Sequence, residues 1–114
     1  MVAPSKELFK KVMGIDLMRT YISDGQEVER NLWINDDYIV WNDVPYTDEV
    51  SIFEFAFKIK EWAEIHGYIL SSSIGLCDIA ISRNVKWIWN ESADTEVEAI
   101  IKAGEWILKD SKEM

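Results

Sequence analysis

The spacing of apolar residues predicts a chain that mixes helices with short strands. Leu8, Phe9 and Val12 recur at helical spacing ahead of Gly14, which predicts a short N-terminal helix with a glycine stop. From residue 17 the pattern changes to short apolar runs separated by polar turns. These runs predict a three-stranded meander over residues 17–22, 28–34 and 38–41, and we expect the short helix to cover an edge of the sheet.

A second helix is predicted over residues 51–66. Ser51 and Glu54 have the spacing of a capping box, and Gly67 supplies the stop. The stripe expected to face the core consists of Ile52, Phe55, Ala56, Ile59, Trp62 and Ala63. Phe53 and Phe57 lie off that stripe and need a second cover. Either the N-terminal helix or a second copy of the chain, in a symmetric dimer, would supply it.

The remaining third of the chain predicts three strands and a closing helix. The strands are expected over residues 68–72, 76–82 and 85–89, and the alternation places Cys77, Ile79 and Ile81 on the buried face of the second one. The helix is capped by Asp94 or Thr95 and extends to residue 109. Gly104 interrupts its apolar stripe, which indicates close approach to the sheet or to another helix.

These elements together predict an α+β fold formed by a single domain, residues 1–114. We expect a mostly antiparallel sheet, built from the three-stranded meander plus the later strands, that packs under two main helices and a short N-terminal helix. The length of 114 residues, with 48% apolar and 29% charged residues, is typical of one globular domain. We find no linker and no internal repeat in the sequence.

The negative charge is concentrated in one segment. Residues 21–50 hold eight acids and one base, and they supply seven of the nine net negative charges. Aromatic side chains among carboxylates favour a surface that a protein partner binds. The predicted partner surface comprises Asp24, Glu27, Glu29, Trp33, Asp36, Asp37, Trp41 and Asp43. Acidic strands can also imitate the phosphates of a nucleic acid, so a mimic or inhibitor is one form of this function.

The six tryptophans divide between core and surface in this interpretation. The core is the expected place of four of them, Trp62, Trp87, Trp89 and Trp106, because two fit helix faces and two share one side of a strand. Trp33 and Trp41 lie in the acidic segment, and at least one of them is expected to be exposed as a contact residue for the partner.

Few residues are suited to catalysis or metal binding. A small hydrolase with a site around His66 and the segment 71–77 is the alternative function, because His66 is the sole imidazole and that segment holds Cys77 and three serines. The end of a helix already explains His66, and a buried face explains Cys77. One His and one Cys make no zinc site, so we expect neither metal nor cofactor. We therefore predict a non-enzymatic protein-binding domain.

The sequence also indicates where the protein works. A single cysteine allows no internal disulfide, and the first residues lack the apolar stretch of a secretion signal, so we expect a cytoplasmic protein. No apolar run reaches the roughly 20 residues of a membrane helix, so no membrane partner is expected. A net charge of −9 argues against direct binding of nucleic acid.

The C-terminal half resembles a family of small phage and prophage proteins. Trp87-Ile88-Trp89, followed by the segment 93–100 and Ala103, is similar to the phage ABA-sandwich type, in which a tryptophan-bearing strand leads through an Ala-Asp-Thr cap into a closing helix. The segment 57–63 is similar to the helix that precedes the second half of the sheet. The resemblance covers residues 51–108. It implies a helix-sheet-helix sandwich and a mobile-element origin, and it assigns no catalytic residue.

Overall fold

The fold is described from a computed structural model, which covers residues 1–17, 21–23, 26–28, 30–43 and 46–113. It contains three helices and eight strands within these residues. In chain order they are α1 (Lys6–Met13), β1 (Tyr21–Ser23), β2 (Gln26–Val28), β3 (Leu32–Asn35), β4 (Tyr38–Asp43), β5 (Tyr46–Ser51), α2 (Ile52–Ile65), β6 (Tyr68–Ser73), β7 (Leu76–Ile81), β8 (Lys86–Ser92) and α3 (Glu96–Glu113). The predicted α+β class and the short N-terminal helix are confirmed.

The strands form separate antiparallel sheets instead of the single sheet predicted. Strands β3, β4 and β5 make one three-stranded sheet, β6, β7 and β8 make another, and β1 pairs with β2 in a hairpin. The predicted strand over residues 28–34 is wrong, because β2 ends at Val28 and β3 begins at Leu32. Strand β5 was not predicted. Its residues 46–49 are all exposed and only Val50 is buried, so its sequence shows no alternation.

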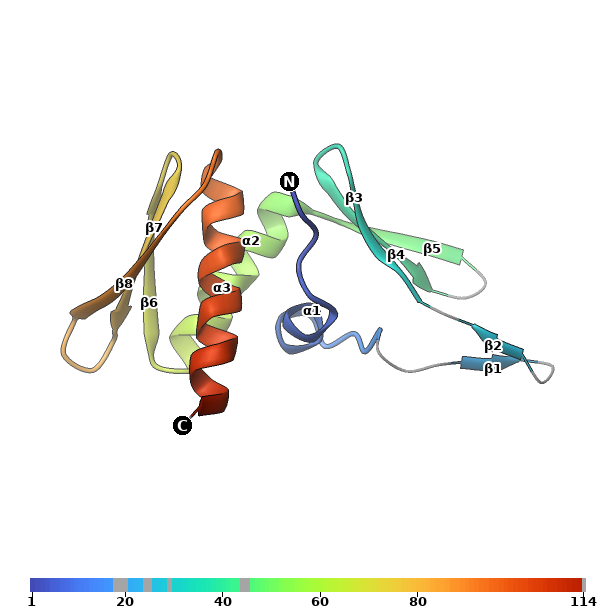
Figure 1. Ribbon diagram of the computed structural model, residues 1–114, viewed down its shortest axis with the longest axis horizontal. Helices are drawn as coiled ribbons and strands as arrows, with labels where there is room; N and C mark the ends of the chain where they lie inside the picture. Colours follow the sequence, from blue (N-terminus) through green and yellow to red (C-terminus); the bar gives the residue numbers. More distant parts are fainter. Residues whose placement is uncertain (18–20, 24–25, 29, 44–45, 114) are drawn as a thin grey trace.

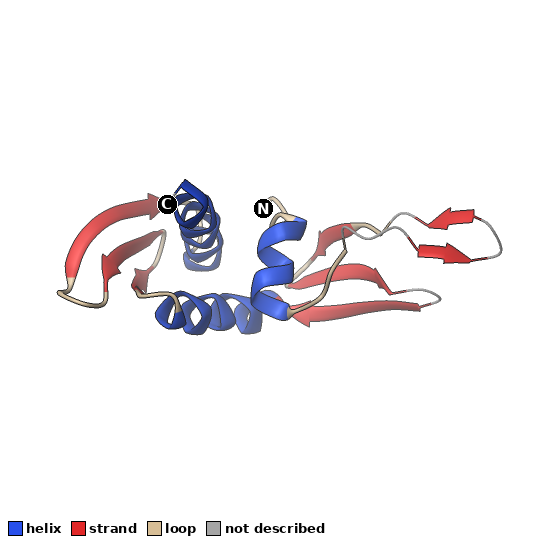
Figure 2. Ribbon diagram, turned by 90° about the horizontal axis from the view of Figure 1, so that it is seen from below, coloured by secondary structure: helices blue, strands red, loops and turns tan. Residues whose placement is uncertain are grey.

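The two three-stranded sheets lie on opposite sides of the helices (Figure 1). Helix α2 follows β5 directly and leads into β6, so it joins one sheet to the other. The view from below shows α2 and α3 between the sheets and α1 beside them (Figure 2). Helices α2 and α3 contact the second sheet, while α1 contacts α2 and α3. The edge position predicted for α1 is therefore wrong, because its apolar side packs on α2, on α3 and on Trp41 of the central strand β4.

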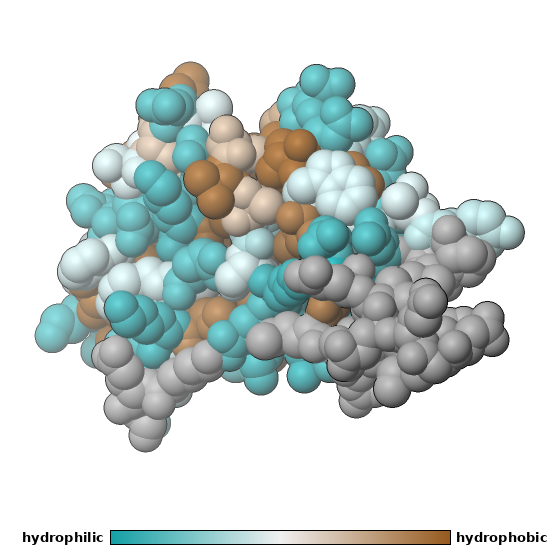
Figure 3. All heavy atoms as spheres, turned by 45° about the vertical axis from the view of Figure 1, so that its right-hand side comes forward, coloured by the Kyte–Doolittle hydropathy of each residue, from teal (hydrophilic) through white to brown (hydrophobic). Residues whose placement is uncertain are grey.

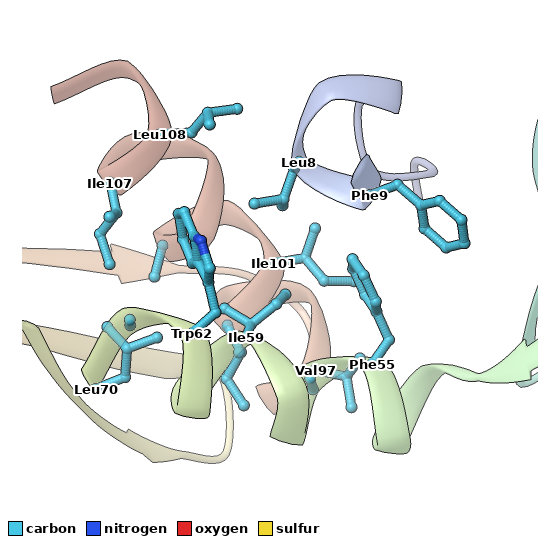
Figure 4. Packing of buried hydrophobic residues seen from close by; sticks show 14 of the residues in the cluster. Leu8, Phe9, Phe55, Ile59, Trp62, Leu70, Val97, Ile101, Ile107 and Leu108 are labelled. Atoms are coloured by element: carbon cyan, nitrogen blue, oxygen red, sulfur yellow. The ribbon is translucent and has the colours of Figure 1, made fainter. Parts of the chain in front are cut away.

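Helix α1 is short but well capped. The Ser5 hydroxyl accepts a hydrogen bond from the Leu8 amide at 3.1 Å, and Gly14 adopts a left-handed φ of 77° at the other end. Leu8 and Phe9 are fully buried. They leave α1 in different directions, with Leu8 directed toward Ile101 of α3 (Figure 4). About two turns of helix therefore fill two parts of the core.

Helix α2 begins and ends as predicted, and the whole predicted core stripe is buried. The Ser51 hydroxyl accepts a hydrogen bond from the Phe53 amide at 3.2 Å. His66 is the C-cap, and Gly67 follows with a φ of 89°. Phe53 and Phe57 are 59% and 64% exposed, so neither α1 nor any other described segment buries them.

The second sheet departs from the predicted alternation at a bulge. Cys77 and Ile79 are buried as predicted, but Ala80 is buried too. The register shifts between Ile79 and Ala80, so that Ile79 pairs with Trp89 and Ala80 pairs with Trp87. A bulge of this kind changes the local twist of the strand and re-aims its side chains.

The two halves of the chain repeat one βββα unit. In each, three antiparallel strands in sequential order lead into a helix. The helices share a Ser/Thr-x-x-Glu-x-x-x-Lys-x-x-Glu-Trp pattern at a constant offset of 44 residues, and the matching positions are Ser51, Glu54, Lys58, Glu61 and Trp62 against Thr95, Glu98, Lys102, Glu105 and Trp106. The absence of a repeat predicted above is therefore wrong. The shared residues are mostly polar, so a search for hydrophobic periodicity overlooks them.

Gly104 marks the crossing of all three helices. A Cβ atom at this position would lie 3.1 Å from a methyl group of Ile59 and 3.3 Å from one of Leu8. The predicted close approach is to α1 and α2. The glycine weakens α3 by about 1 kcal/mol relative to alanine, and this cost is offset by the contact that it permits.

We expect Gly104→Leu to lower the free energy of unfolding by about 1–3 kcal/mol, because the added side chain overpacks the crossing. Urea denaturation of the two proteins measures this difference. In a Leu8→Ala background the cost should shrink by at least about 0.5 kcal/mol, since the truncated side chain makes room. An equal cost in both backgrounds would show that Leu8 does not limit the space at Gly104.

Candidate functional site

The predicted partner surface lies on the first sheet, and the strand register decides which of its residues share a face. Ile34, Ile39 and Val50 pair across the three strands, and the latter two are buried against the helices. Trp33 pairs with Val40, which pairs with Glu49. Because neighbouring residues along a strand point to opposite faces, this second row lies on the side away from the helices.

The side of the first sheet away from the helices, here called the outer sheet face, consists of Trp33, Tyr38, Val40 and Glu49. Trp33 is 38% exposed and Tyr38 is exposed as well, whereas Val40 between Trp33 and Glu49 is only 8% exposed. Val40 lies outside the main core cluster. The side chains that flank it on this face are Trp33 and Glu49, so the face has a small apolar centre with an aromatic and an acidic border.

Two aspartates form the turn at one end of this face. Asn35 pairs with Tyr38, so Asp36 and Asp37 make a two-residue hairpin, and Asp36 has a positive φ of 53° that aspartate tolerates in turns. Both side chains are exposed. The Asp37 carbonyl accepts a hydrogen bond from the Ile52 amide at 2.9 Å. The acidic turn is therefore fixed against the start of α2.

The segment that forms the first sheet carries charged side chains of one sign. No lysine or arginine occurs between Arg30 and Lys58, while that interval holds six acids: Asp36, Asp37, Asp43, Asp48, Glu49 and Glu54. The surface seen with the β3–β5 side forward intersperses hydrophilic and hydrophobic residues (Figure 3). An excess of acids in one segment favours a negative potential, which attracts positively charged partners.

Trp41 does not belong to this surface. It is 4% exposed, and its ring centroid lies 5.0 Å from that of Phe9. Trp41 and Trp33 point to opposite faces of the sheet. The prediction that Trp41 belongs to the partner surface is therefore wrong. Asp24 and Glu29 lie outside the described residues, as do the side chains of Glu27 and Asp43. Of the predicted set, Trp33, Asp36 and Asp37 are exposed on β3 and on the turn that follows it.

The residues of the alternative hydrolase site are not brought together. His66 lies at the end of α2, where its Nδ1 atom is 2.8 Å from the Trp62 carbonyl oxygen and its ring packs on Trp62. Cys77 pairs with Ser72, four residues along β6 from Tyr68. With a rise of about 3.3 Å per residue, Ser72 and Cys77 lie about 13 Å beyond the end of β6 that follows His66.

Cys77 is also inaccessible. Its side chain is fully buried, and this burial raises the pKa of the thiol to about 11, with nearby Lys60 opposing the shift and Asp78 adding to it. A thiol with a raised pKa remains protonated at neutral pH and is a poor nucleophile. The phenol of Tyr68 is shifted in the same direction, to a pKa of about 12, by burial and by its 2.8 Å hydrogen bond to Asp110.

Three tryptophans of the second half are more exposed than predicted. Trp87 is 54% exposed, Trp89 is exposed and Trp106 is half-buried, which corrects the core assignment for these three and leaves it confirmed for Trp62. Trp89 and Trp106 stack with centroids 5.4 Å apart and an interplanar angle of 11°. Strand β8 is an edge strand of the second sheet. The sequence alone does not show which strand lies at an edge.

A hollow of about 420 Å³ lies beside Trp106, between α3 and the N-terminal residues. Its lining includes Val2, Ala3 and Ile101. Two of the acids around it have internal partners, since Glu105 accepts hydrogen bonds from Ser5 and Glu91 accepts one from the Trp89 indole.

Comparisons with known proteins give no further indication of function. No protein family, curated protein or solved structure matches the chain. Within the described residues, no three His, Cys, Asp or Glu side chains are grouped closely enough to hold a metal ion. Among the helices in the part of the chain that the structure covers, none is both long and apolar enough to cross a membrane.

We expect Cys77 to react with Ellman's reagent at pH 8 only as fast as the fold opens, because the thiol is buried and protonated. The labelling rate should therefore rise steeply with urea. His66→Gln should leave the rate in the folded protein unchanged. Immediate labelling without denaturant, slowed by His66→Gln, would instead indicate an accessible thiolate activated by the imidazole and would revive the hydrolase alternative.

Proposed function

We propose that this protein is a non-enzymatic binding domain whose outer sheet face, together with the Asp36-Asp37 turn, binds a positively charged protein surface. The observation that carries the proposal is an exposed tryptophan and an exposed tyrosine on one sheet face, in a segment rich in acids. Trp33 and Tyr38 are exposed on the same face as Glu49, and the sequence between Arg30 and Lys58 holds six acids and no lysine or arginine.

Each part of this surface supports a different property of binding. Tryptophan and tyrosine are enriched among the few residues that carry most of the energy of an interface. Carboxylates mainly accelerate encounter with a basic partner and fix its orientation. A rigid sheet presents both with little loss of conformational entropy on binding, since Asp36 and Asp37 are held in a tight turn that is tied to α2.

A basic groove that normally holds nucleic acid is the partner that this chemistry fits best. Such grooves combine lysine and arginine side chains with aromatic rings that stack on bases. The outer sheet face offers acids in place of phosphates and Trp33 in place of a base. The function would then be that of a nucleic-acid mimic or inhibitor. The resemblance to phage ABA-sandwich proteins adds a phage or prophage origin to this proposal.

The experiment separates the acidic from the aromatic contribution. A partner captured from host lysate at low salt is purified, and its binding kinetics are measured for wild type, the double variant Asp36→Asn/Asp37→Asn, and Trp33→Ala. We expect the double variant to lower the association rate and its salt dependence. Trp33→Ala should instead shorten the lifetime of the complex, with a loss of about 2 kcal/mol or more in binding free energy.

Trp87→Ala is the matched control, because Trp87 is also an exposed tryptophan but belongs to the other sheet. It should bind like wild type. If a captured partner bound wild type, the double variant and Trp33→Ala with equal rates and lifetimes, the outer sheet face would be a solubilising surface only. Displacement of duplex DNA from the partner by wild type, but not by the double variant, would support the mimic.

A further inference from the structure

Helix α2 has a second exposed side, which lies between α3 and β6. Two hollows open along it. The first, about 250 Å³, is lined by Phe53, Ala56, Phe57 and Lys60 of α2 and by Glu96, Val97 and Ile100 of α3. The second, about 340 Å³, is lined by Phe57, Lys60, Glu61 and Glu64 of α2 and by Tyr68, Ile69 and Leu70 of β6. We call this side the α2 groove.

The two hollows are one helical turn apart. Every α2 residue that lines the second hollow lies four positions beyond one that lines the first. At 1.5 Å per residue, their centres are separated by about 6 Å along the axis. Two side chains at positions i and i+4 of another helix have this same spacing. The α2 groove thus has the dimensions to accept two apolar side chains of a helix lying alongside α2.

The groove is apolar at its floor and acidic at its border. Phe57, 64% exposed, stands between the hollows, and Val97, Ile100 and Leu70 lie beneath. Three acids and one base line the hollows: Glu61, Glu64 and Glu96 against Lys60. Glu96 is engaged by the Ser72 hydroxyl at 3.1 Å, whereas Glu61 and Glu64 are exposed. A ligand of this groove needs apolar side chains and positive charge.

We infer that the α2 groove is a docking site for a basic amphipathic helix of a partner protein. Two apolar residues of that helix, one turn apart, fill the hollows on either side of Phe57, and lysine or arginine residues on its flanks meet Glu61 and Glu64. This is the helix-in-groove mode of recognition, in which apolar anchors give affinity and flanking charges give specificity. The site is separate from the outer sheet face and does not depend on the function proposed for that face.

Charge argues for a basic partner over a second copy of the chain. Each α2 groove holds three acids and one base, so two grooves that faced each other would bring together surfaces of the same net charge, and like charges across an interface disfavour association. Each copy also carries nine net negative charges. The dimer predicted from Phe53 and Phe57 is therefore the competing occupant that the experiment has to distinguish.

The test uses a labelled peptide and fluorescence anisotropy. The peptide has about 18 residues, long enough to form a helix, with leucine at i and i+4 in successive turns and lysine on the flanks. Two companion peptides replace the leucines by serine or the lysines by glutamate. We expect only the leucine-lysine peptide to bind wild type. Phe57→Ser should weaken it about tenfold or more, and Glu61→Gln/Glu64→Gln should weaken it less while reducing the salt dependence.

Two control variants remove an exposed ring or two negative charges from surfaces outside the α2 groove. Trp87→Ser removes an exposed ring from the second sheet, and Asp36→Asn/Asp37→Asn removes two charges from the outer sheet face. Both should leave the peptide affinity within about twofold of wild type. Circular dichroism checks that each variant is folded, and Phe57→Leu, which keeps an apolar side chain, should retain most of the binding.

Two results would overturn the inference. One is equal loss of affinity in Phe57→Ser and Trp87→Ser, or in the two charge variants, because the peptide would then bind the acidic protein without a site. The other is a dimer in light scattering that Phe57→Ser converts to a monomer while the peptide does not bind, which would assign the groove to a second copy. Neither result bears on the partner of the outer sheet face, whose test uses Trp33.

Discussion

Phe9 packs on both the first sheet and helix α2, and the position of that sheet against the helices depends on this contact. Its ring centroid lies 5.0 Å from that of Trp41 on β4 and 5.6 Å from that of Phe55 on α2. Aromatic pairs at such distances contribute about 0.5–1.5 kcal/mol beyond their buried area. Phe9 belongs to α1, so a helix of eight residues holds the first sheet against the helical layer.

This arrangement determines which surfaces remain for binding. The helices cover the inner side of the first sheet through Trp41, Ile39 and Val50, so they leave the opposite side, where Trp33 and Tyr38 are exposed, free of helix contacts within the described residues. Helix α2 buries one stripe against α3 and α1 and leaves Phe53 and Phe57 on the side of the α2 groove. Both proposed sites are therefore the uncovered sides of elements whose other sides build the core.

The parts of the fold that follow local periodicity could be predicted from the sequence. The core stripe of α2, its cap at Ser51 and the buried position of Cys77 depend on spacing within one element. Gly104 was also interpretable, because a glycine in an apolar helical stripe has few explanations other than close packing. The predicted resemblance to phage proteins remains a prediction, since no comparison tests it.

The features that depend on how distant segments pair could not be predicted. Residues 46–49 of β5 are all exposed, so this strand lacks the alternation of apolar and polar residues by which a strand is predicted. No local sequence pattern indicates that the strands form two sheets and not one. Trp41 lies in the same acidic segment as Trp33. The strand register nevertheless directs it toward Phe9, so it is not part of the partner surface. Trp87 and Trp89 lie on β8, where a register shift against β7 changes the pairing, and both are exposed; this shift depends on tertiary structure.

The role of Phe9 is best measured by amide hydrogen exchange of wild type and Phe9→Leu, a change that keeps an apolar side chain but removes the ring. If Phe9 holds the first sheet to the helices, the amides of β3, β4 and β5 should lose much more protection than those of β6, β7 and α3, because the sheet opens as a separate unit. A uniform loss of protection over both sheets would contradict this account, and so would a loss confined to α1.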